Sequence, residues 1–225
     1  MILFEFMVAA MKYTDKDIKR IICTLLEDNI DAVMQKSGFS RRKNGLIYSK
    51  SIGTVRQKIE MIYFVHPQYQ TDALAHIYPW LSVYYPEVNE LAAEILGENA
   101  LLSGLKGKTL RQPIQIYTKS ERWILQEEKQ LRRLADGISR FLKEYTLPVL
   151  CELETSAGYI DMYESCDKRL IWDDRQHIYL ACAYALNGEY QKGFKVLEKR
   201  FGNPGLRKQY QKIFAWLEGR ENLKP

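Results

Sequence analysis

Between residues 14 and 85, one amphipathic helical segment is followed by two long segments in which aromatic and β-branched residues alternate with other residues. A helix with one apolar stripe must bury that stripe, and a sheet with one apolar face is a suitable partner. Alternation over this length is typical of β-strands and leaves little room for a helix. The chain is therefore expected to fold as an α+β protein.

The helical segment covers residues 14–37 and has clear signals at both ends. Thr14 is a good N-cap residue, and Asp15 and Asp17 place negative charge where the helix dipole favours it. Gly38 can take a positive φ at the C-terminal end, and Phe39 can pack back on the last turn. We interpret the apolar stripe of this helix as core.

Strands are predicted at residues 46–50, 55–66 and 73–85, with a fourth at 114–117. The connections between the first three are short, so an antiparallel meander of three to four strands is expected. Pro79 lacks an N–H group, which predicts an edge position or a bulge in its strand. A helix is expected between Glu87 and Leu96.

The C-terminal part changes to helical spacing. A helix is expected from Ser120, and residues 174–187 and 189–201 are expected to pair as antiparallel helices joined at Asn187-Gly188. Small residues at Ala183 and Gly193 would allow a close approach, and this hairpin resembles one unit of a tetratricopeptide repeat. No second copy is visible, and a plain helical hairpin is the alternative. The expected divisions are an extension at 1–11, an α+β sheet region at 12–118 and a helical region at 119–225, packed as one compact unit.

Bulk properties indicate a globular chain, with 46% hydrophobic residues and a net charge of +5. No apolar run reaches the ~18 residues that a membrane helix needs, so no membrane partner is expected. The four cysteines form no CxxC pair, which favours reduced thiols and a cytoplasmic location.

Motifs for catalysis are absent from the sequence. It contains no GxGxxG, GxxxxGK[ST], HExxH or GxSxG pattern, and the three histidines do not assemble a metal site. We therefore predict no catalytic residues, no metal and no cofactor.

The charge pattern marks one candidate binding surface. Residues 32–59 contain no acidic residue but seven lysines and arginines. On neighbouring strands, several of these would lie beside outward-facing aromatic residues, where they could bind an anionic partner. The predicted binding residues are Arg41, Arg42, Arg56, Lys58, Tyr78 and Trp80. The alternative is that helices cover the aromatic face and that the charges only protect edge strands.

One family resemblance can be stated from these residues. The order of the first helix, Ser37-Gly38-Phe39, the basic residues, Tyr48 and two long strands resembles the bacterial domain-of-unknown-function 4304 family, as does the segment 142–148. The resemblance covers roughly residues 12–165. It implies an α+β fold and a bacterial source, and it carries over no reaction or catalytic residue.

Three hypotheses about function follow. The first is a non-catalytic protein-binding module that uses the sheet or the C-terminal hairpin, with another protein as its partner. The second is a nucleic-acid or phosphorylated-ligand binder that uses the basic 36–58 segment. The third is an enzyme of an unrecognised type, which would need a cleft with converging polar groups.

Overall fold

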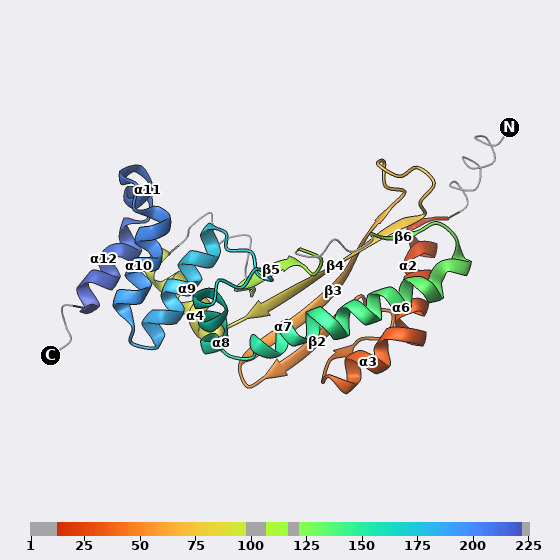
Figure 1. Cartoon of the computed structure of the whole chain (residues 1–225), viewed down its shortest axis with the longest axis horizontal. Helices are drawn as coiled ribbons and strands as arrows, with labels where there is room; N and C mark the ends of the chain where they lie inside the picture. Colours follow the sequence, from red (N-terminus) through yellow and green to blue (C-terminus); the bar gives the residue numbers. More distant parts are fainter. Residues whose placement is uncertain (1–12, 98–106, 117–121, 222–225) are drawn as a thin grey trace. The chain divides into compact units, whose positions relative to one another are not determined.

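The computed structural model describes residues 13–97, 107–116 and 122–221 (Figure 1). The expected extension at 1–11 and the expected helix start at Ser120 lie outside this part. The chain forms two compact units, which are described separately. The first contains residues 1–51, 57–81 and 113–150, and the second contains residues 52–56, 82–112 and 151–225. These divisions differ from those expected, because the segment 122–150 belongs with the first helix and not with the C-terminal helices.

The sheet has the strand order β1-β2-β3-β4-β5, and β6 pairs with β4 outside this path. β1 pairs with β2 and β4 pairs with β6 in antiparallel register, with Arg41 opposite Tyr48 and His76 opposite Ile124. The α+β class with an antiparallel sheet is confirmed. The strands are β1 (Ser40–Arg41), β2 (Ile47–Ile52), β3 (Val55–Val65), β4 (Ala75–Tyr84), β5 (Leu110–Pro113) and β6 (Trp123–Leu125).

The first helix is built as its sequence predicts. The Thr14 hydroxyl accepts from the Asp17 N–H while the Asp17 carboxylate accepts from the Thr14 N–H, so both ends of a capping box are present. The helix ends where Gly38 takes a φ of 82° and the Phe39 N–H donates to the Met34 carbonyl. It runs as α2 (Asp15–Leu25), a π-helical turn η1 (Leu26–Ile30) and α3 (Asp31–Lys36).

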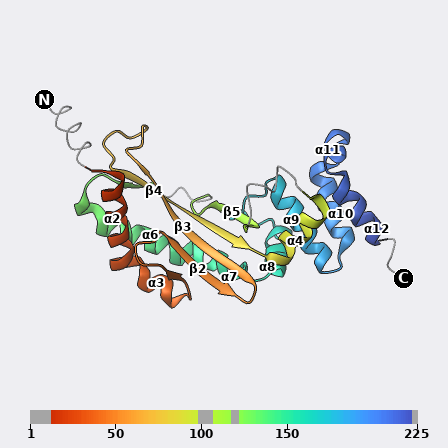
Figure 2. The same ribbon diagram turned by 180° about the vertical axis from the view of Figure 1, so that it is seen from behind.

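Strand alternation separates a helix-covered face of the sheet from its opposite face. Gln57, Ile59 and Met61 of β3 are buried, and the Gln57 side chain donates to the Leu150 carbonyl. On β6, Trp123 lies opposite Ile77 and packs against α6. Figures 1 and 2 show α6 and α7 on this side of strands β2 to β4.

The expected helix around Trp123 is wrong. Trp123–Leu125 forms β6, which pairs with the start of β4, and the helical segment begins later. Alternating burial of Trp123, Ile124 and Leu125 shows why a strand is preferred: two side chains enter the core beside β4. The following elements are η2 (Glu128–Gln130), α6 (Leu131–Phe141), the π-helical turn η3 (Leu142–Thr146) and α7 (Leu147–Glu152).

The expected strand at 114–117 is also displaced. Its place is taken by β5 at Leu110–Pro113, and Ile114 already lies in a turn. The Thr109 N–H donates to the Val83 carbonyl in the second unit. Tyr117 lies outside the described residues.

The second unit contains the predicted helical hairpin. The Gly188 φ of 75° allows the turn between α9 and α10, and Gly193 lies against Ala181. The likeness to a tetratricopeptide unit stays a prediction. The helices of this unit are α4 (Pro86–Leu96), α8 (Ser156–Glu164), α9 (Asp174–Leu186), α10 (Tyr190–Phe201), α11 (Pro204–Gln209) and α12 (Gln211–Glu221).

A buried hydrogen-bond network fixes the core of the second unit. The Tyr159 hydroxyl donates to Gln176 Oε1 at 2.6 Å, and Gln176 Nε2 donates to the Thr109 carbonyl at 2.9 Å. The Tyr85 hydroxyl donates to the Leu153 carbonyl at 2.8 Å. These bonds satisfy polar groups that would otherwise be costly to bury.

Candidate binding surfaces

The sheet face opposite α6 and α7 carries a row of ring side chains in the first unit. We call Phe64, Tyr69, His76, Tyr78 and Trp80 the aromatic row. Neighbouring ring centroids are 5.5 Å apart for His76 and Tyr78, 6.1 Å for Tyr78 and Trp80, and 6.4 Å for Phe64 and Tyr78. The side chain of Phe64 is 49% exposed and that of Tyr69 is 57% exposed. The row therefore presents apolar surface to the outside of the sheet.

The rings hold one another through edge and tilted contacts. Tyr78 and Trp80 meet at an interplanar angle of 84°, and Tyr69 meets His76 at 89°. Such geometries are favourable for aromatic pairs beyond the area they bury. The row is therefore a preformed surface whose side chains already support one another.

His76 lies within the row, in surroundings that disfavour its protonated form. Its ring Nδ1 is hydrogen-bonded to the Tyr69 hydroxyl, and its side chain is buried. Burial lowers the pKa of His76, and the positive charge of Arg122 lowers it further. Both effects favour the neutral ring of His76.

Three of the six predicted binding residues belong to this face of the first unit. Tyr78 and Trp80 are half-buried members of the row on β4, and Lys58 occupies an outward position of β3. Arg56 lies two residues before Lys58, so it occupies an outward position on the same strand. In the second unit its guanidinium lies 5.6 Å from the Tyr84 ring centroid.

Arg41 has a different role from the predicted one. Its side chain is 3% exposed, and its guanidinium donates to the Asp31 carboxylate at 2.7 and 2.9 Å and to the Gly45 carbonyl at 2.8 Å. The prediction of one shared positive surface therefore does not hold for Arg41. Arg42, in the turn after β1, is exposed.

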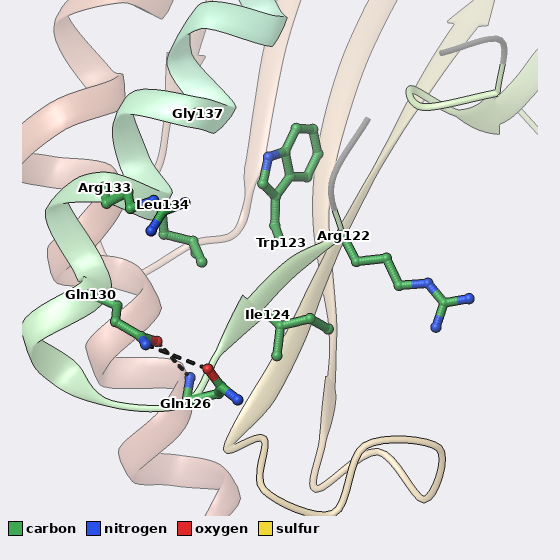
Figure 3. Close-up of a pocket in the computed structure, with 8 residues that line it drawn as sticks. All are labelled: Arg122, Trp123, Ile124, Gln126, Gln130, Arg133, Leu134 and Gly137. Atoms are coloured by element: carbon green, nitrogen blue, oxygen red, sulfur yellow. Dashed lines mark hydrogen bonds between the residues drawn. The ribbon is translucent and has the colours of Figure 1, made fainter. Parts of the chain in front are cut away.

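A second surface, which the sequence reasoning missed, lies along α6 on the other side of the sheet. A hollow of about 240 Å³ is lined by Trp123 and Ile124 from β6 and by Arg133, Leu134 and Gly137 from α6 (Figure 3). Figure 3 also shows that Arg122, although at the same site, is directed away from α6. Gln126 and Gln130 bond to each other there, as part of the cap of η2.

A wider, open hollow of about 600 Å³ continues this surface, and it shares Arg133 and Gly137 with the first. We call the two hollows together the basic groove. The wider one is lined by Lys129, Arg132, Arg133, Asp136, Gly137 and Arg140. The helical spacing of these charges was visible in the sequence and could have indicated the groove. The contact with Trp123 could not be found in this way, because Trp123 belongs to a strand that was predicted as a helix.

The described residues include no group of three or more His, Cys, Asp or Glu side chains placed to hold a metal ion. His177 is engaged through Nδ1 with the Asp173 carbonyl at 2.7 Å, and burial lowers its pKa. Among residues 13–97, 107–116 and 122–221, no helix combines the length and apolar character needed to cross a membrane.

Comparisons with known protein families, with curated proteins and with solved structures find no match to this chain. The resemblance to the domain-of-unknown-function 4304 family, together with the bacterial source and cytoplasmic location expected from the sequence, therefore stays a prediction.

Proposed function

We propose that this protein is a non-catalytic binding protein and that it recognises another protein through the aromatic row. The observation that carries the proposal is the exposure of Phe64 and Tyr69, which both pack on His76 within a continuous series of rings. Contiguous exposed apolar surface on a folded protein commonly marks an interaction site. Tyrosine and tryptophan are also enriched at the centres of protein interfaces.

The charge distribution around the row favours a protein over a nucleic acid at this face. Binding a phosphate backbone depends on several free cations. Within the 36–58 segment, Arg41 is already ion-paired with Asp31. The basic 36–58 segment therefore supplies fewer free charges than its sequence suggests, which weakens the nucleic-acid hypothesis for this face.

The test uses the wild-type chain and a double variant as baits in affinity capture from the native host. The affinity of each bait for the purified captured protein is then measured. Phe64→Ser with Tyr78→Ser removes the centre of the row, and we expect at least about tenfold weaker binding to that protein, as for loss of interface hot spots. Unchanged affinity in the double variant would contradict the proposal. So would capture of nucleic acid alone.

A matched control removes exposed apolar side chains elsewhere. Tyr145 is 45% exposed on η3 and Leu206 is 41% exposed on α11, which is close to the exposure of Phe64. Tyr145→Ser with Leu206→Ser should leave the affinity unchanged. Thermal melting of both double variants separates a lost contact from a lost fold.

A further inference from the structure

The basic groove on α6 is a second binding surface with a different chemistry. We propose that it binds the phosphate backbone of a single-stranded nucleic acid. This inference does not depend on the protein partner proposed for the aromatic row, because the groove lies on the helix-covered side of the sheet and its ligand is anionic.

The groove has positive charges that no acidic side chain among the described residues neutralises. Arg132, Arg133 and Arg140 are exposed, and within the described part of the chain none of them has an acidic partner within 4 Å. Lys129 differs, because it pairs with Glu127 at 2.5 Å. Asp136 lines the groove as well, so the three free arginines outweigh one carboxylate.

Gly137 of α6 and Trp123 of β6 meet at the floor of the groove. Gly137 has no side chain, and a Cβ placed there would lie 3.6 Å from Trp123 Nε1, so the indole lies directly behind the helix backbone. Trp123 is itself fixed by an edge contact with Phe141 at a centroid distance of 5.4 Å. The fixed indole and the helix backbone at Gly137 together line the hollow that lies between the arginine side chains.

The shape and the residue types favour a strand of phosphates over a small anion. Residues eight apart on a helix are separated by about 12 Å along the axis, so Arg132 and Arg140 can contact different phosphates of one strand. The wider hollow is open rather than enclosing. Guanidinium groups bind phosphate oxygens in two-point geometry, which lysine cannot reproduce.

The test measures binding of a fluorescently labelled single-stranded oligonucleotide by anisotropy, at several salt concentrations, with the whole chain. Three phosphate contacts predict a slope of log affinity against log salt of about −2. Arg132→Gln, Arg133→Gln and Arg140→Gln combined should weaken binding by about tenfold or more at low salt and should flatten the slope toward zero.

A charge-matched control separates a local site from general positive charge. Lys195, Lys199 and Lys208 are exposed on α10 and α11, and replacing all three by Gln removes the same charge. This control should bind as the wild type does. Equal weakening in both triple variants would overturn the proposal, and so would the absence of any binding at low salt.

A competition arm separates a nucleic acid from other anions. An unlabelled oligonucleotide should displace the labelled one, whereas a polyglutamate peptide of equal charge should do so at least about tenfold less well, since carboxylates lack the phosphate geometry. Equal displacement by polyglutamate would overturn the assignment to nucleic acid. Melting curves confirm that the glutamine variants, whose changed side chains are exposed, remain folded.

Discussion

Arg41 and Asp31 form a two-point ion pair, in which Nε donates to Oδ1 at 2.9 Å and Nη2 donates to Oδ2 at 2.7 Å. The Tyr48 hydroxyl donates to the same carboxylate at 2.5 Å. The pair connects α3 to β1 and β2, so it fixes the first helix against the edge of the sheet. Burial raises the pKa of Tyr48, and its bond to the Asp31 charge raises it further.

The first prediction is that Arg41→Met destabilises the protein by about 3 kcal/mol. Removing Arg41 takes both guanidinium bonds from the half-buried Asp31 carboxylate, which then keeps the Tyr48 hydroxyl as a donor. The measurement is the free energy of unfolding from urea denaturation at pH 7. Arg42→Met is the control, because this neighbouring side chain is exposed, and it should change the free energy by less than about 0.5 kcal/mol.

The second prediction concerns how the difference in unfolding free energy between wild type and Arg41→Met depends on pH. Burial of Asp31 opposes its ionisation, but the bonds from Arg41 and Tyr48 outweigh burial and lower the pKa of Asp31. A lowered pKa in the folded state gives stability that is present above the unfolded value of about 3.9 and is lost as the pH falls through the folded value. The gap in unfolding free energy between wild type and Arg41→Met should therefore narrow below pH 4. A gap that stays constant down to pH 2.5 would show that the ion pair is not its source.

The third prediction tests the close approach of α9 and α10. A Cβ on Gly193 would lie 2.9 Å from the Ala181 carbonyl oxygen, so either helix would have to move. Gly193→Ala should lower the unfolding free energy by about 1–3 kcal/mol through overpacking.

Gly219 of α12 supplies the control for this prediction, because nothing lies within 4 Å of a Cβ placed there. Gly219→Ala should be neutral or should stabilise by up to about 1 kcal/mol, since alanine favours the helix. Equal destabilisation at both positions would mean that the effect is not contact between the helices.

The fourth prediction concerns the buried network of the second unit. Gln176→Leu leaves the Thr109 carbonyl without its side-chain donor and removes the acceptor Oε1 from the Tyr159 hydroxyl. The Tyr159 hydroxyl keeps the main-chain carbonyl of residue 176, at 3.1 Å, as an acceptor. One unpaired buried polar group costs about 1–3 kcal/mol, so we expect a loss of about 1–3 kcal/mol in urea denaturation. A loss below about 0.5 kcal/mol would show that the network is not needed for stability.

Local signals explain which parts of the fold were predicted. The Thr14 and Asp17 capping box and the glycines at 38 and 188 act within a few residues, so their elements were found close to their actual bounds. The strand β6 was missed because Trp123, Ile124 and Leu125 are compatible with either periodicity. Only their pairing with residues 75–77, far away in the sequence, decides for a strand.

For the candidate sites too, local patterns could be predicted and contacts between distant residues could not. Strand alternation was enough to place Lys58, Tyr78 and Trp80 on one face. The role of Arg41 was not predicted, because it depends on Asp31, ten residues earlier, which the fold brings to the end of β1. The basic groove depended on an indole from β6 reaching a glycine of α6, a contact between two elements of which one was not predicted.

Site-specific photo-crosslinking in the native host tests whether the face bearing the aromatic row binds another protein. A benzoylphenylalanine at position 64 should give a discrete adduct that protease removes and nuclease does not. The same group at position 145, equally exposed on the helix-covered side, should not give that adduct. Adducts that are identical at both positions, or absent at position 64, would contradict the account.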